Sequence, residues 1–221
     1  MGESAGVAPH LLRASQLEPK IRRRWKVANR GQAGSSSSMW LPETGKCFEQ
    51  TFGTGSACAN ADIVVILLGV SDIMALLLDE DMPPAALDRA SETLYLEGEL
   101  SALAKNIQAI VVRLIRDGKK VCLVDLPRSG VPGAGLGKIR CLNAQIKQIC
   151  RKQGGALRDE KGSLELVSLG TNYRMLQPEF RSFDSCHLNR KGYSRLALEI
   201  FETIAPFMIH VEWNVWKLKL T

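Results

Sequence analysis

The residue types best suited to chemistry lie near the carboxyl end, in the string FDSCHLNRKGY from Phe183 to Tyr193. This string places Asp184 three residues before His187, which is one of only three histidines in the chain. A loop that holds an aspartate and a histidine together can orient the imidazole and stabilise its charged form, as activation of a hydroxyl nucleophile requires. The D-x-x-H spacing also arises by chance, so its interpretation depends on the elements that position it.

Apolar segments of two kinds alternate along the chain. Short apolar runs predict strands at 25–29, 63–68, 121–124 and 164–167. Apolar residues at helical spacing predict helices at about 8–24, 96–114 and 139–149, and a final helix after His187. This alternation predicts an α/β fold, namely a three-layer α/β/α sandwich with a mostly parallel sheet.

Polar and glycine-rich residues follow these predicted strands. They include Asn29-Arg30-Gly31, Gly69-Val70-Ser71-Asp72 and Asp125, and the Asp184–His187 loop follows the strand at 164–167. In open parallel sheets, sites form at the carboxyl ends of the strands. We therefore expect these residues to converge on one edge of the sheet.

Four short motifs stand in a characteristic order. They are Gly2-Glu3-Ser4, the segment Asn29-Arg30-Gly31-Gln32-Ala33-Gly34-Ser35, Gly69-Val70-Ser71-Asp72, and Asp184 with His187. From Gly2 to about Phe207 the chain thus resembles the SGNH (GDSL-type) hydrolases, a family of esterases, lipases, thioesterases and carbohydrate deacetylases.

The resemblance implies a site and a reaction. Ser4 matches the nucleophile, His187 the general base, and Asp184 the carboxylate that orients the base. The amides of Ser4 and Gly34, with Ser71, match the oxyanion hole. The implied activity is cleavage of a small-molecule, lipid or carbohydrate ester through an acyl-enzyme, with no metal or organic cofactor.

Three departures from the family pattern favour an alternative. Glu3 stands where the family has aspartate, and Ser71 stands where it has an asparagine whose amide is the third oxyanion donor. Only three residues precede Ser4, so we expect the family's first strand to be missing, through truncation or replacement by another element. The alternative is a catalytically impaired relative that acts as a binding or scaffold module.

The bulk properties bound the remaining possibilities. Hydrophobic residues make up 45% of the 221 residues and charged residues 24%, as in soluble globular domains. No apolar run approaches the ~18 residues of a membrane span, and no signal peptide is evident. We expect a cytoplasmic protein comprising an SGNH-like domain at 1–208 and an extension of strand-like composition at 209–221. The oligomeric state stays open.

The net charge of +6 is concentrated in the segment from Lys20 to Lys26, followed by Arg30. Such a segment could be a nucleic-acid or acidic-lipid patch. The favoured interpretation is the solvated end of a surface helix, with no nucleic-acid partner, because no nucleic-acid module accompanies it.

Several weaker features have ordinary interpretations. The six cysteines lack metal spacing, and a Cys47–Cys58 disulfide is the less favoured alternative to free thiols. Buried thiols are expected at Cys122, Cys141 and Cys150. The segment 133–138 is expected to be a mobile loop rather than a phosphate site, and the serines at 35–38 a loop and helix start rather than nucleophiles. Asp72 is expected to cap the helix or loop that follows its strand.

Overall fold

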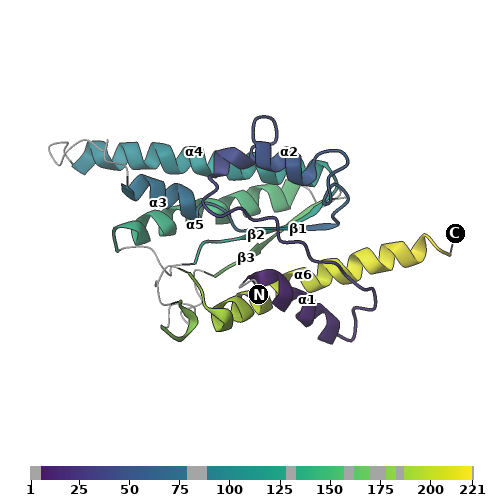
Figure 1. Ribbon diagram of the computed structural model, residues 1–221. Coiled ribbons are helices and arrows are strands. Elements are labelled where there is room, and N and C mark those ends of the chain that lie inside the picture. Colours follow the sequence, from purple (N-terminus) through teal and green to yellow (C-terminus); the bar gives the residue numbers. More distant parts are fainter. Residues whose placement is uncertain are drawn as a thin grey trace.

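Parallel strands form the centre of the protein, and helices cover both faces of their sheet (Figure 1). The computed structural model describes residues 6–78, 89–127, 133–156, 162–169, 178–182 and 187–220. Within these residues the strands are β1 (Ile63–Ile66), β2 (Lys120–Val124) and β3 (Ser163–Val167). Their order across the sheet is β1-β2-β3, with Val64 beside Val121 and Val121 beside Leu164. The predicted α/β fold with a parallel sheet is confirmed.

The helices that connect the strands cover one face of the sheet. α3 (Val70–Leu78) and α4 (Arg89–Arg116) lie between β1 and β2, and α5 (Gly133–Ala156) lies between β2 and β3. Because successive strands advance in one direction across the sheet, crossovers of one hand place their helices on the same face. The resulting core contains Val64, Ile66, Val121, Leu123 and Leu164 from the strands, with Ile73, Ile107, Leu114, Ile139 and Ile146 from the helices.

The first and last helices cover the opposite face. α1 (Val7–Leu17) packs along α6 (Arg190–Lys217) beneath the sheet in Figure 1. Side chains alternate between the faces of a strand, so Cys122 and Val124 of β2 face this second core. Its other buried members include Leu11, Val167, Leu188, Leu196, Ile200, Ile204 and Met208. The helices predicted at 96–114, at 139–149 and after His187 are confirmed, and each extends beyond its predicted bounds.

The strand predicted at Trp25–Asn29 is wrong. The segment is irregular and pairs with no strand in the described part of the chain, and the preceding helix ends at Leu17 rather than near residue 24. Glu212 of α6 accepts the indole N–H of Trp25 and the main-chain N–H groups of Arg22 and Arg23, which precede the segment, each at 2.9 Å. The chain next to the predicted strand is therefore held by a side-chain carboxylate of α6.

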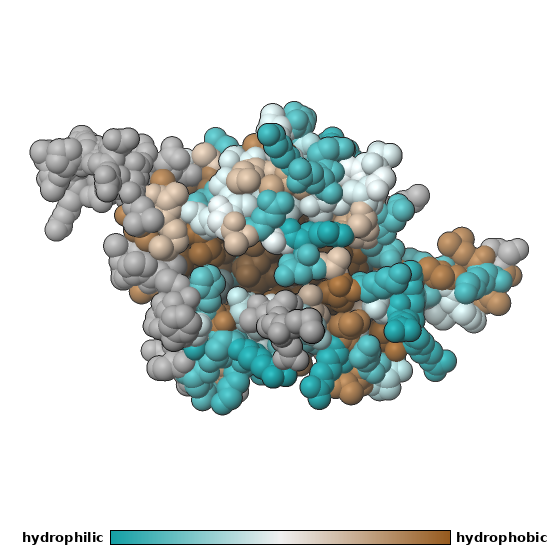
Figure 2. Space-filling view, viewed as in Figure 1, coloured by the Kyte–Doolittle hydropathy of each residue, from teal (hydrophilic) through white to brown (hydrophobic). Residues whose placement is uncertain are grey.

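The strand-like interpretation of the carboxyl-terminal extension is also wrong. Residues 209–217 continue α6 without a break, so the proposed boundary at residue 208 falls inside this helix. The first half of α6 is buried against the sheet, whereas its last turns project beyond it (Figures 1 and 2). Helical propagation from the packed half therefore determines the conformation of the projecting half.

The segment Gly133–Lys138 is the first part of α5 and not a loop, so that expectation is wrong as well. α5 begins at Gly133 and continues through the apolar period that starts at Ile139. The glycines lower helix propensity locally, but the packed residues that follow stabilise the helix.

The cysteines in the described part of the chain are free thiols. Cys47 and Cys58 are both free, and Cys47 is buried with its thiol 3.3 Å from Gln32 Oε1. Cys122 is buried as predicted, and burial raises the pKa of its thiol to about 12. Cys141 and Cys150 were also expected to be buried, but both are only partly buried because they lie toward the edge of the face that α5 packs on the core. Burial, with the charges of Glu165 and Asp125, raises the pKa of Cys150 to about 11. A thiol with so high a pKa is a poor nucleophile near neutral pH.

Among the described residues, no helix has the length and apolar character needed to cross a membrane.

The Glu212 contacts generate a stability prediction. Desolvation raises the pKa of this carboxyl, but the hydrogen bonds from Arg22, Trp25 and Arg23, with the charge of Arg23, outweigh it and lower the pKa. A carboxyl with a lowered folded pKa stabilises the fold above its unfolded pKa and loses this contribution as pH falls through the folded value. Glu212→Gln should therefore lower the free energy of unfolding by about 1–2 kcal/mol at pH 7.

Urea unfolding at pH 7 and pH 3 measures this effect, with Glu202→Gln, an exposed position of the same helix, as the control. The difference between the Glu212 variant and wild type should shrink as pH falls below the ordinary value of 4.5. An equal difference at both pH values would contradict the ionic role of Glu212.

Candidate active site

A partly buried carboxylate joins a loop to the start of a helix at the carboxyl edge of the sheet. Asp72, in the first turn of α3, accepts the main-chain N–H of Ser37 at 2.9 and 3.0 Å and the Ser37 hydroxyl at 2.8 Å. The amide of Asn106 in α4 donates to the same hydroxyl at 3.0 Å. Because Ser37 is only 1% exposed, these bonds fix the loop that follows Asn29 onto the start of α3.

This arrangement corrects the expected role of Asp72. Its carboxylate holds a residue 35 positions earlier in the chain, rather than capping its own helix. Sequence reasoning also missed Asn106. Asn106 stands three positions after Leu103 and four before Ile110, so it lies on the apolar face of the helix. A polar residue on that face indicates a buried polar contact, and this signal could have been used.

Two of the serines at 35–38, Ser35 and Ser37, are buried, and their hydroxyls hold the loop together by hydrogen bonds. The Ser35 hydroxyl donates to the carbonyl of Gln32 and accepts the indole N–H of Trp40, both at 2.9 Å. A 3₁₀ helix, η1 (Ser37–Trp40), begins directly afterwards. The predicted loop and helix start is confirmed, and neither buried hydroxyl faces solvent as a nucleophile would.

Gly34 has the conformation and exposure that an oxyanion loop needs. Its φ is +73°, a left-handed value that favours glycine, and the residue is exposed. A Cβ added at Gly34 would meet no atom within 4 Å. The backbone here is therefore open to an approaching ligand, as the oxyanion role requires.

Ser71 lies beside this loop at the positive end of α3. It is partly exposed and belongs to the first turn, where helix N–H groups lack intrahelical partners. Gly69, with φ of +119°, makes the turn from β1 into this helix. A Cβ at Gly69 would lie 3.0 Å from the Leu142 side chain, so both the backbone angle and the space favour glycine.

The start of α1 lies next to the same loop. Gly6 precedes α1, and a Cβ added to it would lie 3.6 Å from the side-chain nitrogen of Asn29. Asn29 in turn accepts the main-chain N–H of Gly31 at 3.0 Å. Ser4, the predicted nucleophile, lies outside the described residues, two positions before Gly6.

His187 is exposed at the entrance to α6. Its carbonyl accepts the N–H of Ser182 at 2.8 Å, and Arg181 forms an antiparallel bridge with Leu188. These contacts join the two ends of the segment that contains Asp184. Asp184 itself lies outside the described residues, so the predicted Asp184–His187 contact stays a prediction.

Asn189 holds the beginning of α6. Its side chain accepts the N–H of Gly192 at 3.0 Å and donates to the carbonyls of Glu179 and Arg181 at 2.7 and 2.8 Å. It is therefore an N-cap that also secures the chain on the far side of the His187 loop. The position of His187 follows from this cap.

Asp125 ends β2 at the same edge and is completely buried. Its carboxylate accepts the main-chain N–H of Leu169 and, at 3.2 Å, the hydroxyl of Ser168, while Lys147 lies 3.9 Å away. Asn143 of α5 bonds to both main-chain groups of the next residue, Leu126, at 2.7 and 2.9 Å. These side chains tie the strand ends together, a role that spacing alone did not predict.

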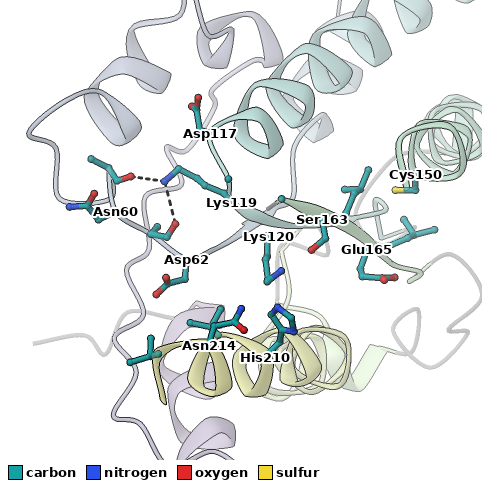
Figure 3. Close-up of a pocket in the computed structure, with 18 of the residues that line it drawn as sticks. Asn60, Asp62, Asp117, Lys119, Lys120, Cys150, Ser163, Glu165, His210 and Asn214 are labelled. Carbon is teal, nitrogen blue, oxygen red and sulfur yellow. Dashed lines mark hydrogen bonds between the residues drawn. The ribbon is translucent and has the colours of Figure 1, made fainter. Parts of the chain in front are cut away.

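A hollow of about 1460 Å³ lies at the opposite edge of the sheet, where the strands begin (Figure 3). Lys119 donates there to the carbonyls of Ala59 and Ala61 at 2.5 and 3.2 Å. Burial lowers the pKa of Lys119, although nearby Asp117 and Asp62 oppose this shift. Its amine is thus committed to the main chain, and none of Gly34, Ser71 and His187 lines the hollow.

In the described part of the chain, no three or more histidine, cysteine, aspartate or glutamate side chains lie close enough together to hold a metal ion.

Comparison with protein-family models, with curated proteins and with solved structures finds no significant match for this chain.

The junction between the loops can be tested by Asp72→Ala. Loss of the carboxylate leaves the buried N–H and hydroxyl of Ser37 short of an acceptor, so the free energy of unfolding should fall by about 2–3 kcal/mol. Urea unfolding measures the loss, and faster amide hydrogen exchange at Ser37 should accompany it.

The matched control is Asp117→Ala, which removes a half-exposed carboxylate paired with Arg113 across one helical turn. That change should cost less than about 1 kcal/mol. If the two variants were equally stable, the junction would not hold the loop.

Proposed function

We propose that the protein is a serine hydrolase of the SGNH type, which cleaves carboxylic esters through an acyl-enzyme. The observation that supports this most is the Asp72–Ser37 junction, because it joins the Asn29–Gly34 loop to the turn that carries Ser71. The open backbone at Gly34 and the nearness of Gly6 to Asn29 add support. Helices on both faces of a parallel sheet are compatible with the proposed α/β/α sandwich.

In the proposed reaction, the Ser4 hydroxyl attacks the ester carbonyl while His187 removes its proton. The carbonyl oxygen becomes an oxyanion, which the amides of Ser4 and Gly34 stabilise with Ser71. His187 then protonates the departing alcohol, and water releases the acid by the reverse sequence. Asp184 holds the imidazole in the required tautomer and stabilises its charged form.

The oxyanion hole is the weakest part of this proposed site. A serine hydroxyl is shorter than an asparagine amide, so Ser71 reaches less far toward a developing charge. Loss of one such donor typically costs ~10² to 10³ in kcat. Slow turnover is therefore expected. The competing proposal is a binding or scaffold module that keeps the fold without the reaction.

A fluorophosphonate probe tests the nucleophile. It should form a covalent adduct at Ser4, because the proposed site activates that hydroxyl alone, and mass spectrometry of the peptides should locate it. Ser4→Ala should abolish both labelling and hydrolysis of p-nitrophenyl acetate. An adduct at another serine, or none in the folded protein, would favour the scaffold proposal.

Ser71→Asn tests the oxyanion hole. The longer amide should raise kcat for p-nitrophenyl acetate, by up to the ~2.7 kcal/mol that one donor supplies. KM should change little, since the gain is realised only as the oxyanion forms. Steady-state kinetics measure both constants, and Ser71→Ala is the matched variant without a donor. An Asn variant no faster than the Ala variant would show that residue 71 does not face the oxyanion.

A further inference from the structure

The projecting end of α6 carries an unusual concentration of exposed large apolar side chains. Trp213 and Trp216 are 50% and 51% exposed, and Leu218 and Leu220 are 78% and 67% exposed. The two indole rings stack with centroids 4.9 Å apart. In Figure 2 this end extends from the body with hydrophobic side chains on its surface. We call these four residues the apolar tip.

Cations are interleaved with the apolar tip. The Lys217 amine lies 5.4 Å from the centroid of the Trp213 ring, and Lys219 stands between the two leucines. Such an arrangement lets the aliphatic stems lie along apolar surface while the amines stay in a polar phase. The tip is therefore apolar and positive at once.

A second positive segment is held beside the tip. Glu212 accepts the N–H groups of Arg22 and Arg23, so the basic segment Lys20–Lys26 is fixed one residue before Trp213. At 1.5 Å rise per helical residue, Glu212 is about 7.5 Å along the axis from Lys217, where the helix ends. The carboxylate of Glu212 is occupied by these hydrogen bonds. Positive charge near the tip comes from the exposed side chains of Lys20, Arg22, Arg24 and Lys26.

We propose that the apolar tip and the segment Lys20–Lys26 together bind the surface of an anionic lipid bilayer. Tryptophan prefers the boundary between headgroups and acyl chains, leucine enters the apolar side of that boundary, and lysine and arginine pair with anionic headgroups. The apolar tip supplies the tryptophans and leucines, and the basic segment supplies the lysines and arginines. This inference is independent of the proposed esterase activity.

Charge and composition argue against the other occupants. A second copy of this chain, docked by two-fold symmetry, would bring the same positive groups together, and like charges across an interface are costly. A nucleic acid would satisfy the cations and could stack on the indoles. It would leave the leucines, which are the most exposed members of the tip, without an apolar environment.

The test is co-sedimentation of the full chain with vesicles of phosphatidylcholine alone or with about 30% phosphatidylserine. Binding to the phosphatidylserine vesicles should be strong at low salt and fall as salt screens the charges. Trp213→Ser combined with Trp216→Ser should weaken it at least tenfold, and so should Arg24→Glu combined with Lys26→Glu. A blue shift of tryptophan fluorescence should accompany binding by the wild type.

Matched controls use exposed residues on other elements, with Met39→Ser for the apolar change and Lys46→Glu combined with Lys105→Glu for the charge change. Both should bind as the wild type does, and circular dichroism should show every variant folded. Failure of the folded wild type to bind phosphatidylserine vesicles would overturn the proposal. So would equal binding by the tip and control variants, a tip-dependent dimer without vesicle binding, or tip-dependent oligonucleotide binding without it.

Discussion

The burial of the central strand β2 on both faces is the constraint on which the rest of the structure depends. Val121, Cys122 and Val124 have no exposed surface, and alternate residues face separate apolar cores. Strand β1 and strand β3 pair with its two edges in parallel. Because all three strands point the same way, the chain leaves them at a single edge, so Ser71 after β1 and Asp125 after β2 lie at that edge.

Polar contacts connect the segments that meet at this edge of the sheet. Asp72 connects the loop before β1 to the helix after it, and Asp125 connects the end of β2 to the residues after β3. A buried carboxylate such as Asp125 is costly unless it is fully partnered. Asp125 and the partly buried Asp72 each join segments that apolar packing alone would not fix in place. The edge is thus more precisely held than its loop composition suggests.

The two halves of α6 have different roles. Its first half carries Leu196, Ile200 and Ile204 into the core, whereas its last turns leave the body with tryptophans and leucines exposed. Glu212 lies at the transition and holds the basic segment beside the helix. His187 stands just before the start of this helix, and the proposed lipid-binding surface is at its end, so α6 would connect the proposed reactive edge to the proposed docking surface.

Features determined by local sequence were predictable, and features determined by distant partners were not. The apolar runs at 63–68 and 121–124 were predicted as strands and both contain one, although β1 ends at Ile66 and Leu67 is 41% exposed. The helical period from Leu103 to Leu114 predicted the helix that is present. Trp25–Asn29 has strand composition, but no strand pairs with it in the described part of the chain, and its Trp25 indole bonds instead to Glu212, 187 residues away. The tail has strand-like composition too, yet it continues a helix already packed. Asp72 was expected to cap the element after its strand, whereas its actual partner, Ser37, is distant in sequence and is brought to it only by the fold.

The most direct test of the proposed site is a crystal structure of the chain after reaction with a fluorophosphonate. The account predicts phosphorus bonded to Ser4 Oγ, with a phosphonyl oxygen about 2.7–3.1 Å from the amide of Gly34 and close to Ser71. The imidazole of His187 should contact Ser4 Oγ and Asp184. Phosphorus on another residue, or an oxygen directed away from Gly34, would contradict the claim that this edge of the sheet is an ester-hydrolysing site.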